Sequence, residues 1–225
     1  MSNDWLERWE VGRIGWHETD GNKSLPKYWQ ARGRRVLVPL CGKSKDLLWL
    51  ERQGNDVVGV ELSDIAARAF FDENGITYSV VDGRLPAYVG QDYRITIYCG
   101  DYFDLSLDTA EAPFDALYDR GALVAIQPNS RISYVKHTRS LLTEDAFKLI
   151  ISVEYDQSIA SGPPFSVPTE AQQALWPELE RIDAYDDMDN CPPKFREAGL
   201  KDMLEVVWMS QPSTPRRRTT EGRPE

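Results

Sequence analysis

The chain has 225 residues and a formal net charge of -10, and its hydrophobic share of 41% is typical of a folded globular protein rather than a disordered one. Proteins that hold nucleic acid normally neutralise its phosphates with clustered Lys and Arg, so this acidic balance argues against a nucleic-acid partner. The length favours one domain, which we place at residues 1–210. We expect the basic, proline-rich stretch 211–225 to be a disordered tail.

Cysteine and histidine are scarce. The three cysteines form no C-x-x-C pair and there are only two histidines, which argues against a disulfide framework or a metal site. The first ten residues mix charges with indoles and lack the apolar core of a signal peptide. Uninterrupted apolar runs span about five residues, far fewer than the roughly 20 that a membrane helix needs. We therefore expect a soluble cytoplasmic protein with no membrane partner.

The N-terminal residues 1–33 favour two short helices. Asp4 and Glu7 have the spacing of a capping box, and Trp5 and Trp9, four residues apart, share one helix face. A second helix is predicted from Ser24 to Gly33. We expect these helices to form a segment that covers a ligand site.

From residue 35 onward, apolar strands alternate with amphipathic helices. Strands are predicted at 35–40, 57–60, 94–99, 114–118 and 147–155, and helices at 44–53, 64–74 and 131–142. This alternation indicates an α/β fold with a Rossmann-like, doubly wound and mostly parallel sheet. Two more strands, at 181–185 and 200–209, have only a short Pro-broken connection between them, so we expect an antiparallel hairpin at the C-terminal edge.

Open sheets of this kind bind ligands at the carboxyl ends of their strands, near the point where strand order reverses. The turn from Leu40 to Gly42 follows the first predicted strand, and Glu61 ends the second, about 20 residues later. An acidic residue at that spacing accepts the hydroxyls of a bound ribose in nucleotide-binding sheets. The alternative is an exposed glutamate without a ligand.

The turn after the first strand has a single glycine, whereas a dinucleotide pyrophosphate needs the close backbone approach of G-x-G-x-x-G. An adenosyl ligand without a pyrophosphate, such as S-adenosylmethionine, fits better than a nicotinamide dinucleotide. Its sulfonium would be stabilised by aromatic faces, which Trp5, Trp9 and Trp16 offer. Indoles on an amphipathic helix are also common as core residues.

Several motifs together resemble the thiopurine S-methyltransferase family. They occur in this order along the chain: W-x-x-x-W at 5–9 followed by Trp16 and His17, V-P-L-C-G-K at 38–43, V-V-G-V-E at 57–61, D-R-G-A-L-V-A-I at 119–126, and G-P-P-F-S-V-P at 162–168. The resemblance runs from about Trp5 to Met209. It implies a methyltransferase that uses S-adenosylmethionine, releases S-adenosylhomocysteine, needs no metal and acts as a monomer.

The resemblance also implies a set of cofactor contacts: Trp5, Trp9, Trp16, Leu40, Glu61, Asp101, Tyr102 and Arg120. Asp101 would accept a hydrogen bond from the adenine amino group while the Tyr102 ring packs on the adenine. The alternative for Asp101 is a cap of a helix or turn.

For the acceptor site, the resemblance implies contacts with Trp16, Pro164 and Phe165. Arg120 is our candidate for stabilising the thiolate form of the acceptor, and its alternative is a structural ion pair with a neighbour such as Asp119. His17 is a second candidate for assisting deprotonation, although a histidine there also suits plain packing.

A second basic residue of the family, before the last strand, has two candidates here, Lys194 and Arg196, of which we favour Arg196. The expected acceptor is a small aromatic or heterocyclic thiol such as a thiopurine, or a selenium or tellurium species. An adenosyl-binding protein without catalytic activity is the alternative function.

Overall fold

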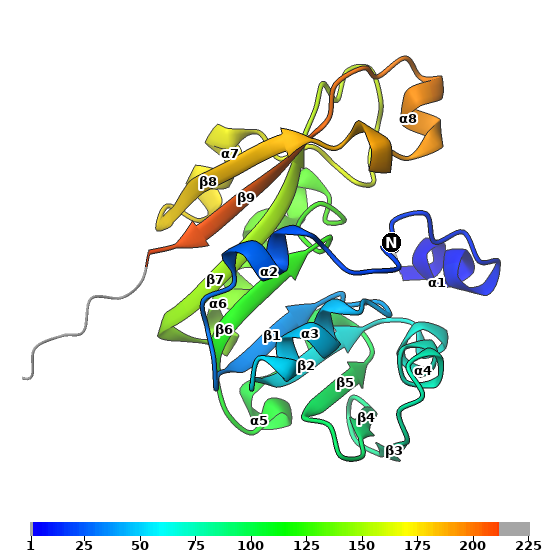
Figure 1. Cartoon of the computed structure of the whole chain (residues 1–225), viewed down its shortest axis with the longest axis vertical. Coiled ribbons are helices and arrows are strands. Elements are labelled where there is room, and N and C mark those ends of the chain that lie inside the picture. Colours follow the sequence, from blue (N-terminus) through cyan, green and yellow to red (C-terminus); the bar gives the residue numbers. More distant parts are fainter. Residues whose placement is uncertain (1, 212–225) are drawn as a thin grey trace, which may run out of the picture.

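The computed structural model describes residues 2–211, whose nine strands form one twisted sheet in the order β3-β4-β5-β2-β1-β6-β7-β9-β8 (Figure 1). The strands are β1 Arg35–Pro39, β2 Asp56–Glu61, β3 Tyr78–Val81, β4 Ala87–Gly90, β5 Ile95–Cys99, β6 Phe114–Arg120, β7 Leu142–Glu154, β8 Leu179–Asp186 and β9 Leu204–Ser210. The α-helices are α1 Ser2–Glu10, α2 Ser24–Tyr28, α3 Asp46–Arg52, α4 Asp64–Glu73, α5 Leu107–Ala110, α6 Arg131–Leu141, α7 Thr169–Leu175 and α8 Pro193–Glu197. The predicted tail falls almost entirely outside the described residues.

The α/β fold and the C-terminal antiparallel hairpin are confirmed, but the sheet is more mixed than predicted. The five central strands, β5-β2-β1-β6-β7, pair in parallel. Antiparallel strands flank them on both sides: β9 and β8 on one, β4 and β3 on the other. Because β3 and β4 are only four residues long, they give little periodic signal and were missed in the sequence.

Strand order reverses between β1 and β6. From β1 the chain moves outward through β2 to β5, and then returns to place β6 on the other side of β1, followed by β7. The carboxyl ends of β1 and β6 therefore lie side by side at the topological switch point, where open sheets bind ligands. Leu40 directly follows β1, and Arg120 is the last residue of β6.

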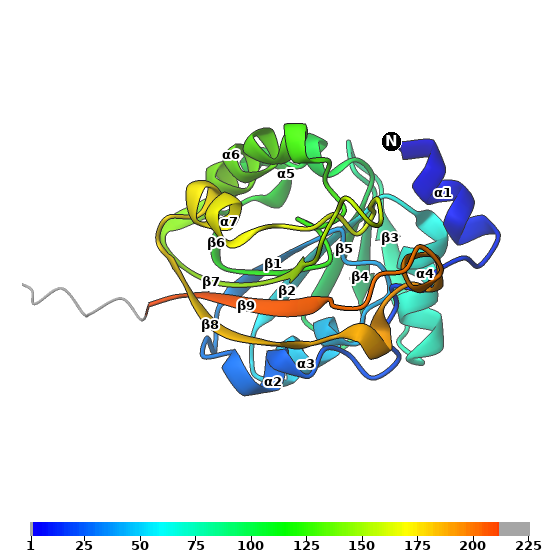
Figure 2. The same ribbon diagram turned by 90° about the horizontal axis from the view of Figure 1, so that it is seen from above.

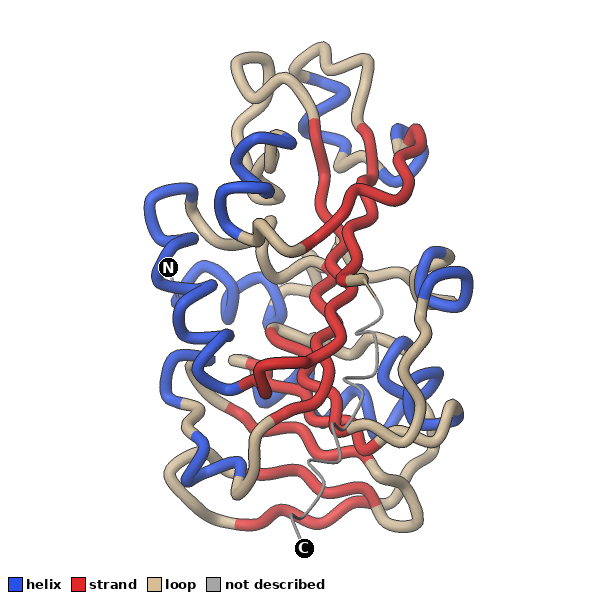
Figure 3. The backbone as a smooth tube through the Cα atoms, turned by 90° about the vertical axis from the view of Figure 1, so that its left-hand side faces the viewer, coloured by secondary structure: helices blue, strands red, loops and turns tan. Residues whose placement is uncertain are grey.

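Helices cover both faces of this sheet (Figures 2 and 3). Successive side chains of a strand point to opposite faces, so Val36 and Val38 of β1 pack with α2, α3 and α4, while Leu37 packs with α6 and α7. Both interfaces are buried apolar clusters. The parallel strands are therefore fixed from both sides, and the carboxyl edge they share is held rigidly.

The second helix is shorter than predicted and lies elsewhere. It ends at Tyr28, because Trp29 turns away in an extended conformation and its indole packs edge-on against Tyr118 and Phe147. Lys27 and Tyr28 both donate to Asp183 of β8. Helix α2 thus packs beside β8 on a face of the sheet, and α1 is the N-terminal helix at the carboxyl edge.

Residues 11–23 join α1 to α2, and we call residues 16–24, which end at the first residue of α2, the strap. Asn22 is its buried anchor: its backbone N–H donates to Asp46 Oδ1 at 2.8 Å, and its side-chain Nδ2 donates to both carboxylate oxygens of Glu205 at 3.1 and 3.0 Å. Gly21 has φ +79°, and a Cβ there would lie 2.5 Å from Asp46 Oδ1, so this approach requires glycine. The strap is pinned to α3 and to β9 at once.

Replacing Asn22 by Ala should lower the free energy of unfolding by about 1 to 3 kcal/mol, because the buried Glu205 carboxylate loses its amide donors. Urea denaturation followed by circular dichroism measures the change. The control is Asn129→Ala at an exposed position, expected to stay within about 0.5 kcal/mol of the wild type. Equal stability of the two variants would contradict the anchoring role of Asn22.

Candidate functional site

Glu61 lies at the carboxyl end of β2 and is buried, 6% exposed. Its Oε2 accepts the Gly42 N–H and its Oε1 accepts the Ser63 N–H, each at 2.8 Å. Burial raises the pKa of Glu61, and the backbone N–H groups oppose this by favouring the charged form. Each carboxylate oxygen keeps a second lone pair, so the group can also accept from the hydroxyls of a ligand.

The turn between β1 and α3 has an unusual backbone. Leu40 and Gly42 both have positive φ, +49° and +54°, and Leu40 is one of the few residues other than glycine to do so. Such conformations cluster at ligand sites. A Cβ at Gly42 would meet the Trp9 indole at 3.4 Å, so the turn and α1 are in close contact.

Three indoles gather beside this turn. Trp16 packs edge-on against Trp5 and Trp9, with ring centroids 5.0 and 6.0 Å away, and the guanidinium of Arg8 lies 5.0 Å above the Trp5 ring. Trp9 is buried, whereas Trp5 and Trp16 are partly exposed. The sequence correctly predicted that Trp5 and Trp9 share a face, and the strap adds Trp16 to it.

Arg120 reaches from the end of β6 to the strap. Its Nη1 donates to the Trp16 carbonyl at 3.0 Å, and its Nη2 forms an ion pair with Glu18. Although burial opposes the charged form, Glu18 holds the pKa of Arg120 above its ordinary value. The suggested ion pair with Asp119 is wrong, because the Asp119 carboxylate accepts from the Leu123 N–H and the Tyr134 hydroxyl.

Glu18 was not identified as a site residue in the sequence. Burial raises its pKa to about 7, Arg120 acts in the opposite direction, and the carboxylates of Glu205, Asp46 and Asp187 raise it further. His17, the residue directly before Glu18, is surrounded by other charged groups. Burial lowers the pKa of His17, Lys43 lowers it further, and Glu73, which pairs with Lys43, acts in the opposite direction.

Asp101 and Tyr102, the two predicted site residues that follow β5, both make contacts within the protein. Asp101 is exposed, and its Oδ1 accepts the Phe103 N–H at 2.9 Å, so it caps the short 3₁₀ turn Tyr102–Asp104. The Tyr102 ring is 5% exposed and packs in the core beside Tyr134, with its hydroxyl 2.9 Å from Thr138. The packing of this ring on a ligand stays a prediction, and most of its surface is covered by core neighbours. Asp101 keeps one oxygen without a partner among residues 2–211.

The segment 162–166 is held rigidly beside the chain that follows β6, where the Phe165 N–H donates to the Val124 carbonyl at 2.6 Å. The Tyr155 hydroxyl donates to the Pro164 carbonyl at 2.7 Å, and Arg131 donates to the Ser166 carbonyl at 3.0 Å. The Phe165 ring covers Gly162, where a Cβ would lie 2.4 Å from a ring carbon. Phe165 is partly exposed, so it presents an aromatic surface fixed by its neighbours.

Of the two basic candidates in α8, Lys194 contacts the residue just before the segment 162–166, and Arg196 does not. The Arg196 guanidinium donates to the carbonyls of Met188 and Asp189, which ties α8 to the preceding turn. Lys194 Nζ donates to the Ser161 carbonyl at 3.3 Å, and its pKa is lowered by burial and by Arg8 of α1. Helices α8 and α1 thus approach each other across the carboxyl edge (Figure 1).

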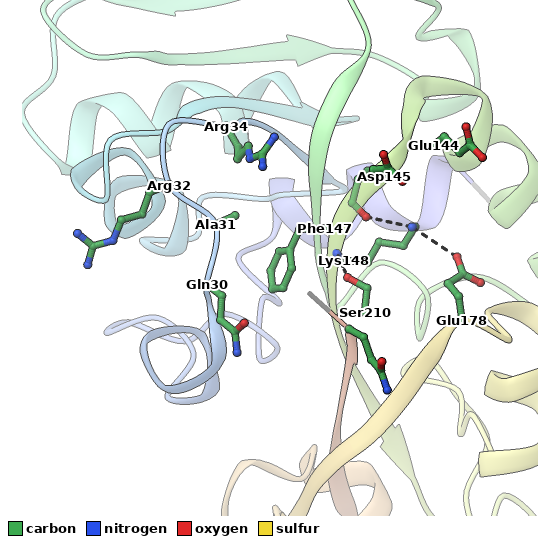
Figure 4. Close-up of a pocket in the computed structure, with 12 residues that line it drawn as sticks. Gln30, Ala31, Arg32, Arg34, Glu144, Asp145, Phe147, Lys148, Glu178 and Ser210 are labelled. Atoms are coloured by element: carbon green, nitrogen blue, oxygen red, sulfur yellow. Dashed lines mark hydrogen bonds and ion pairs between the residues drawn. The ribbon is translucent and has the colours of Figure 1, made fainter. Parts of the chain in front are cut away.

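A cavity of about 640 Å³ opens at the opposite, amino edge of the sheet, between the chain before β1 and the start of β7 (Figure 4). Its buried cation, Lys148, is already paired, with Nζ 3.1 Å from the Ala146 carbonyl and 3.5 Å from Glu178. The other carboxylates that line it, Glu144 and Asp145, are exposed, and none of its lining residues is an indole or has a positive φ. Within residues 2–211, no three His, Cys, Asp or Glu side chains are grouped to hold a metal ion, and no helix suits a membrane span.

The carboxyl edge fits an adenosyl sulfonium ligand by its donor set. Glu61 is a buried acceptor at the end of β2, where sheets of this kind bind ribose, and the turn at Leu40 and Gly42 has one glycine where a pyrophosphate would need several. Trp5 and Trp16 offer partly exposed aromatic faces for a cation. The residues present therefore suit S-adenosylmethionine.

Comparison with known proteins agrees with this geometry. The family model for thiopurine S-methyltransferase matches residues 1–213. Thiopurine S-methyltransferases of Nitrosospira multiformis and Bordetella petrii are 40% and 41% identical to the chain, covering 91% and 92% of it and 95% and 96% of their own lengths.

Solved structures share the fold at low sequence identity. A SAM-dependent methyltransferase from Anabaena variabilis has a TM-score of 0.59 at 13% identity, covering 93% of this chain and 95% of that one. The Burkholderia thailandensis 1,6-didemethyltoxoflavin-N1-methyltransferase, solved with 1,6-didemethyltoxoflavin and S-adenosylhomocysteine, has a TM-score of 0.57 at 20% identity, covering 93% and 87%.

The contact between Gly42 and Trp9 is testable with a matched pair of variants. Gly42→Ala and Gly33→Ala both place a side chain at positive φ, and each should cost about 1 to 2 kcal/mol of stability. Only the Gly42 variant has an indole within 4 Å, so only it should shift the tryptophan fluorescence of the folded protein. Identical spectra for the two variants would contradict the packing of α1 on the turn.

Proposed function

Since this chain belongs to the thiopurine S-methyltransferase family, we propose that it methylates the sulfur of small aromatic or heterocyclic thiols. That it is a S-adenosylmethionine-dependent methyltransferase follows from the family and from the fold. The acceptor class rests on one observation of the site: the Arg120 guanidinium is fixed at the switch point by the strap, beside the indoles.

The residues of the carboxyl edge would hold the methyl donor. Glu61 would accept from the ribose hydroxyls, the turn at Leu40 would lie against the adenosyl group, and Trp5 and Trp16 would face the sulfonium. When bound, the donor supplies a methyl group that is activated for displacement. Burial of Glu61 and Trp9 would keep water out of this part of the site.

Arg120 would act on the acceptor. A thiolate attacks carbon far better than a thiol does, and a cation within a few ångströms lowers the pKa of the thiol. The Phe165 ring and the rigid backbone around Pro164 would position a flat acceptor. The same cation would stabilise selenolate and tellurolate, so we include these species among the candidate acceptors.

A panel assay tests this function. The pure protein is incubated with radiolabelled S-adenosylmethionine and thiophenols, thiopurines, selenite or tellurite, and labelled products are separated. We expect transfer to thiols. In parallel, the Tm of the protein is measured with S-adenosylhomocysteine and with a nicotinamide dinucleotide. We expect only S-adenosylhomocysteine to raise the Tm. Stabilisation without any transfer would support an adenosyl-binding protein without catalytic activity instead.

Glu61→Ala should weaken S-adenosylhomocysteine binding about 5- to 150-fold, equivalent to roughly 1 to 3 kcal/mol, because ribose hydroxyls lose a buried charged acceptor. Isothermal titration calorimetry measures the change. Glu144→Ala, exposed at the amino edge, serves as the control and should bind like the wild type. Unchanged affinity of the Glu61 variant would remove it from the site.

Arg120→Ala should reduce kcat/KM for thiols at neutral pH by roughly 10- to 1000-fold, because the pKa of the bound thiol rises by about 1 to 3 units. The loss should shrink at high pH, where the thiol ionises unaided. Arg120→Lys should retain part of the activity. A loss that is the same at every pH would contradict thiolate stabilisation.

A further inference from the structure

We propose that Glu18 is the proton acceptor for the acceptor thiol. This role rests on the proposed thiol methylation and assigns a second catalytic residue to the same site. The proposal rests on the position of Glu18 in the strap, on its free carboxylate oxygen, on the charges around it, and on the poorer suitability of the other bases at this edge.

The strap fixes the position of Glu18. Four residues further on, Asn22 is bonded to Asp46 and Glu205, and two residues before, the Trp16 carbonyl is bonded to Arg120. Glu18 therefore sits between two anchored points, and its carboxylate meets the guanidinium that we assign to thiolate stabilisation. A thiol that approaches the Nη2 side of the guanidinium also approaches Glu18.

One oxygen of Glu18 is available. Oε1 accepts from Arg120, and no residue of the described range 2–211 donates to Oε2. The side chain is 21% exposed, as is that of Arg120, so the pair is accessible from the carboxyl edge. The carboxylate can hold Arg120 through one oxygen and receive a proton on the other.

Charged groups from four elements face Glu18: Arg120 of β6, Glu205 of β9, Asp46 of α3, and Asp187 between β8 and the turn before α8. Burial raises the pKa of Glu18, and the three acidic groups raise it further. Together these effects exceed the lowering of the pKa by Arg120. They bring the pKa of Glu18 to about 7. A general base with a pKa near the working pH combines a substantial ionised fraction with good proton affinity.

The other candidate bases of the edge are less suitable. Burial and the cations Lys43 and Arg120 lower the pKa of His17 below its ordinary 6.5, so it is a weaker base than Glu18. Asp119 is fully buried, and both its oxygens already accept hydrogen bonds. Glu61 is bonded to two backbone N–H groups at the ribose position.

The acceptor S–H bond breaks, and its proton passes to Glu18 Oε2, while the electron pair left on sulfur is stabilised by Arg120. This electron pair forms the new bond between sulfur and the methyl carbon, while the bond from that carbon to the donor's sulfonium sulfur breaks. The methylated acceptor and S-adenosylhomocysteine each then carry a neutral thioether sulfur. Glu18 then releases its proton to solvent through its exposed face.

The test compares Glu18→Gln with the wild type on acceptors of different thiol pKa. With an alkyl thiol, whose pKa resembles the roughly 8.5 of cysteine, kcat/KM at pH 7 should fall about 10- to 100-fold. With a nitro-substituted thiophenol, which is already ionised, it should stay within about threefold. A merely structural role would reduce both reactions equally, and that result would overturn the proposal.

The pH profile gives a second readout. Glu18 must be ionised to accept a proton, so kcat/KM of the wild type for alkyl thiols should rise as pH increases through about 7. In the wild type this rise should level off above about pH 7, whereas in Glu18→Gln it should continue up to the pKa of the thiol itself, and Glu18→Asp should keep the wild-type profile at a reduced rate. Asp20→Asn, an exposed carboxylate of the same strap, should behave like the wild type.

A measurement without turnover completes the test. In protein with ¹³C-labelled glutamate carboxyls and bound S-adenosylhomocysteine, one signal should titrate near pH 7 and be missing in Glu18→Gln. Absence of that signal from the wild type would overturn the proposal.

The outcomes separate the two proposals. Wild-type protein that methylates no thiol would refute the proposed function, whereas active wild type with an equally active Glu18→Gln variant would refute the role of Glu18 alone.

Discussion

The buried hydrogen bonds of Asn22 are the constraint on which the carboxyl edge depends. They join the strap to α3 through Asp46 and to β9 through Glu205, elements from opposite ends of the chain. Because the strap cannot move away, the Trp16 carbonyl and the Glu18 carboxylate remain within reach of Arg120 at the switch point. An N-terminal segment with little secondary structure thereby completes a site that the sheet alone would leave open.

The edge separates two kinds of chemistry. Around β2, Glu61 is buried and satisfied by backbone N–H groups, which suits binding of neutral hydroxyls. Around β6, Arg120 and Glu18 form a partly exposed pair in a mostly acidic surrounding, which suits the movement of a proton. The indole of Trp9 lies beside Gly42, and the carbonyl of Trp16, whose ring packs on Trp9, accepts from Arg120. The negative net charge of the chain also favours a cationic donor over a polyanionic one.

Sequence reasoning captured the parts that follow from local pattern. Apolar runs located the parallel strands, and their spacing placed Leu40 and Glu61 at one edge. It missed the β3–β4 hairpin, whose strands are too short for a periodic signal, and it extended α2 beyond Trp29, which turns inward to pack. The core packing of Tyr102 and the bonds of Arg196 to the turn before α8 are contacts that local sequence pattern does not reveal. Glu18 escaped notice since its importance arises from contacts with residues more than 100 positions away.

The most direct test of this account is a crystal structure of the protein with S-adenosylhomocysteine and an aryl thiol. We predict that the thiol sulfur lies within hydrogen-bond reach of Glu18 Oε2 and of the Arg120 guanidinium, with the aromatic ring against Phe165. A sulfur bound beside His17 and Lys43, or anywhere away from the Glu18–Arg120 pair, would contradict the account.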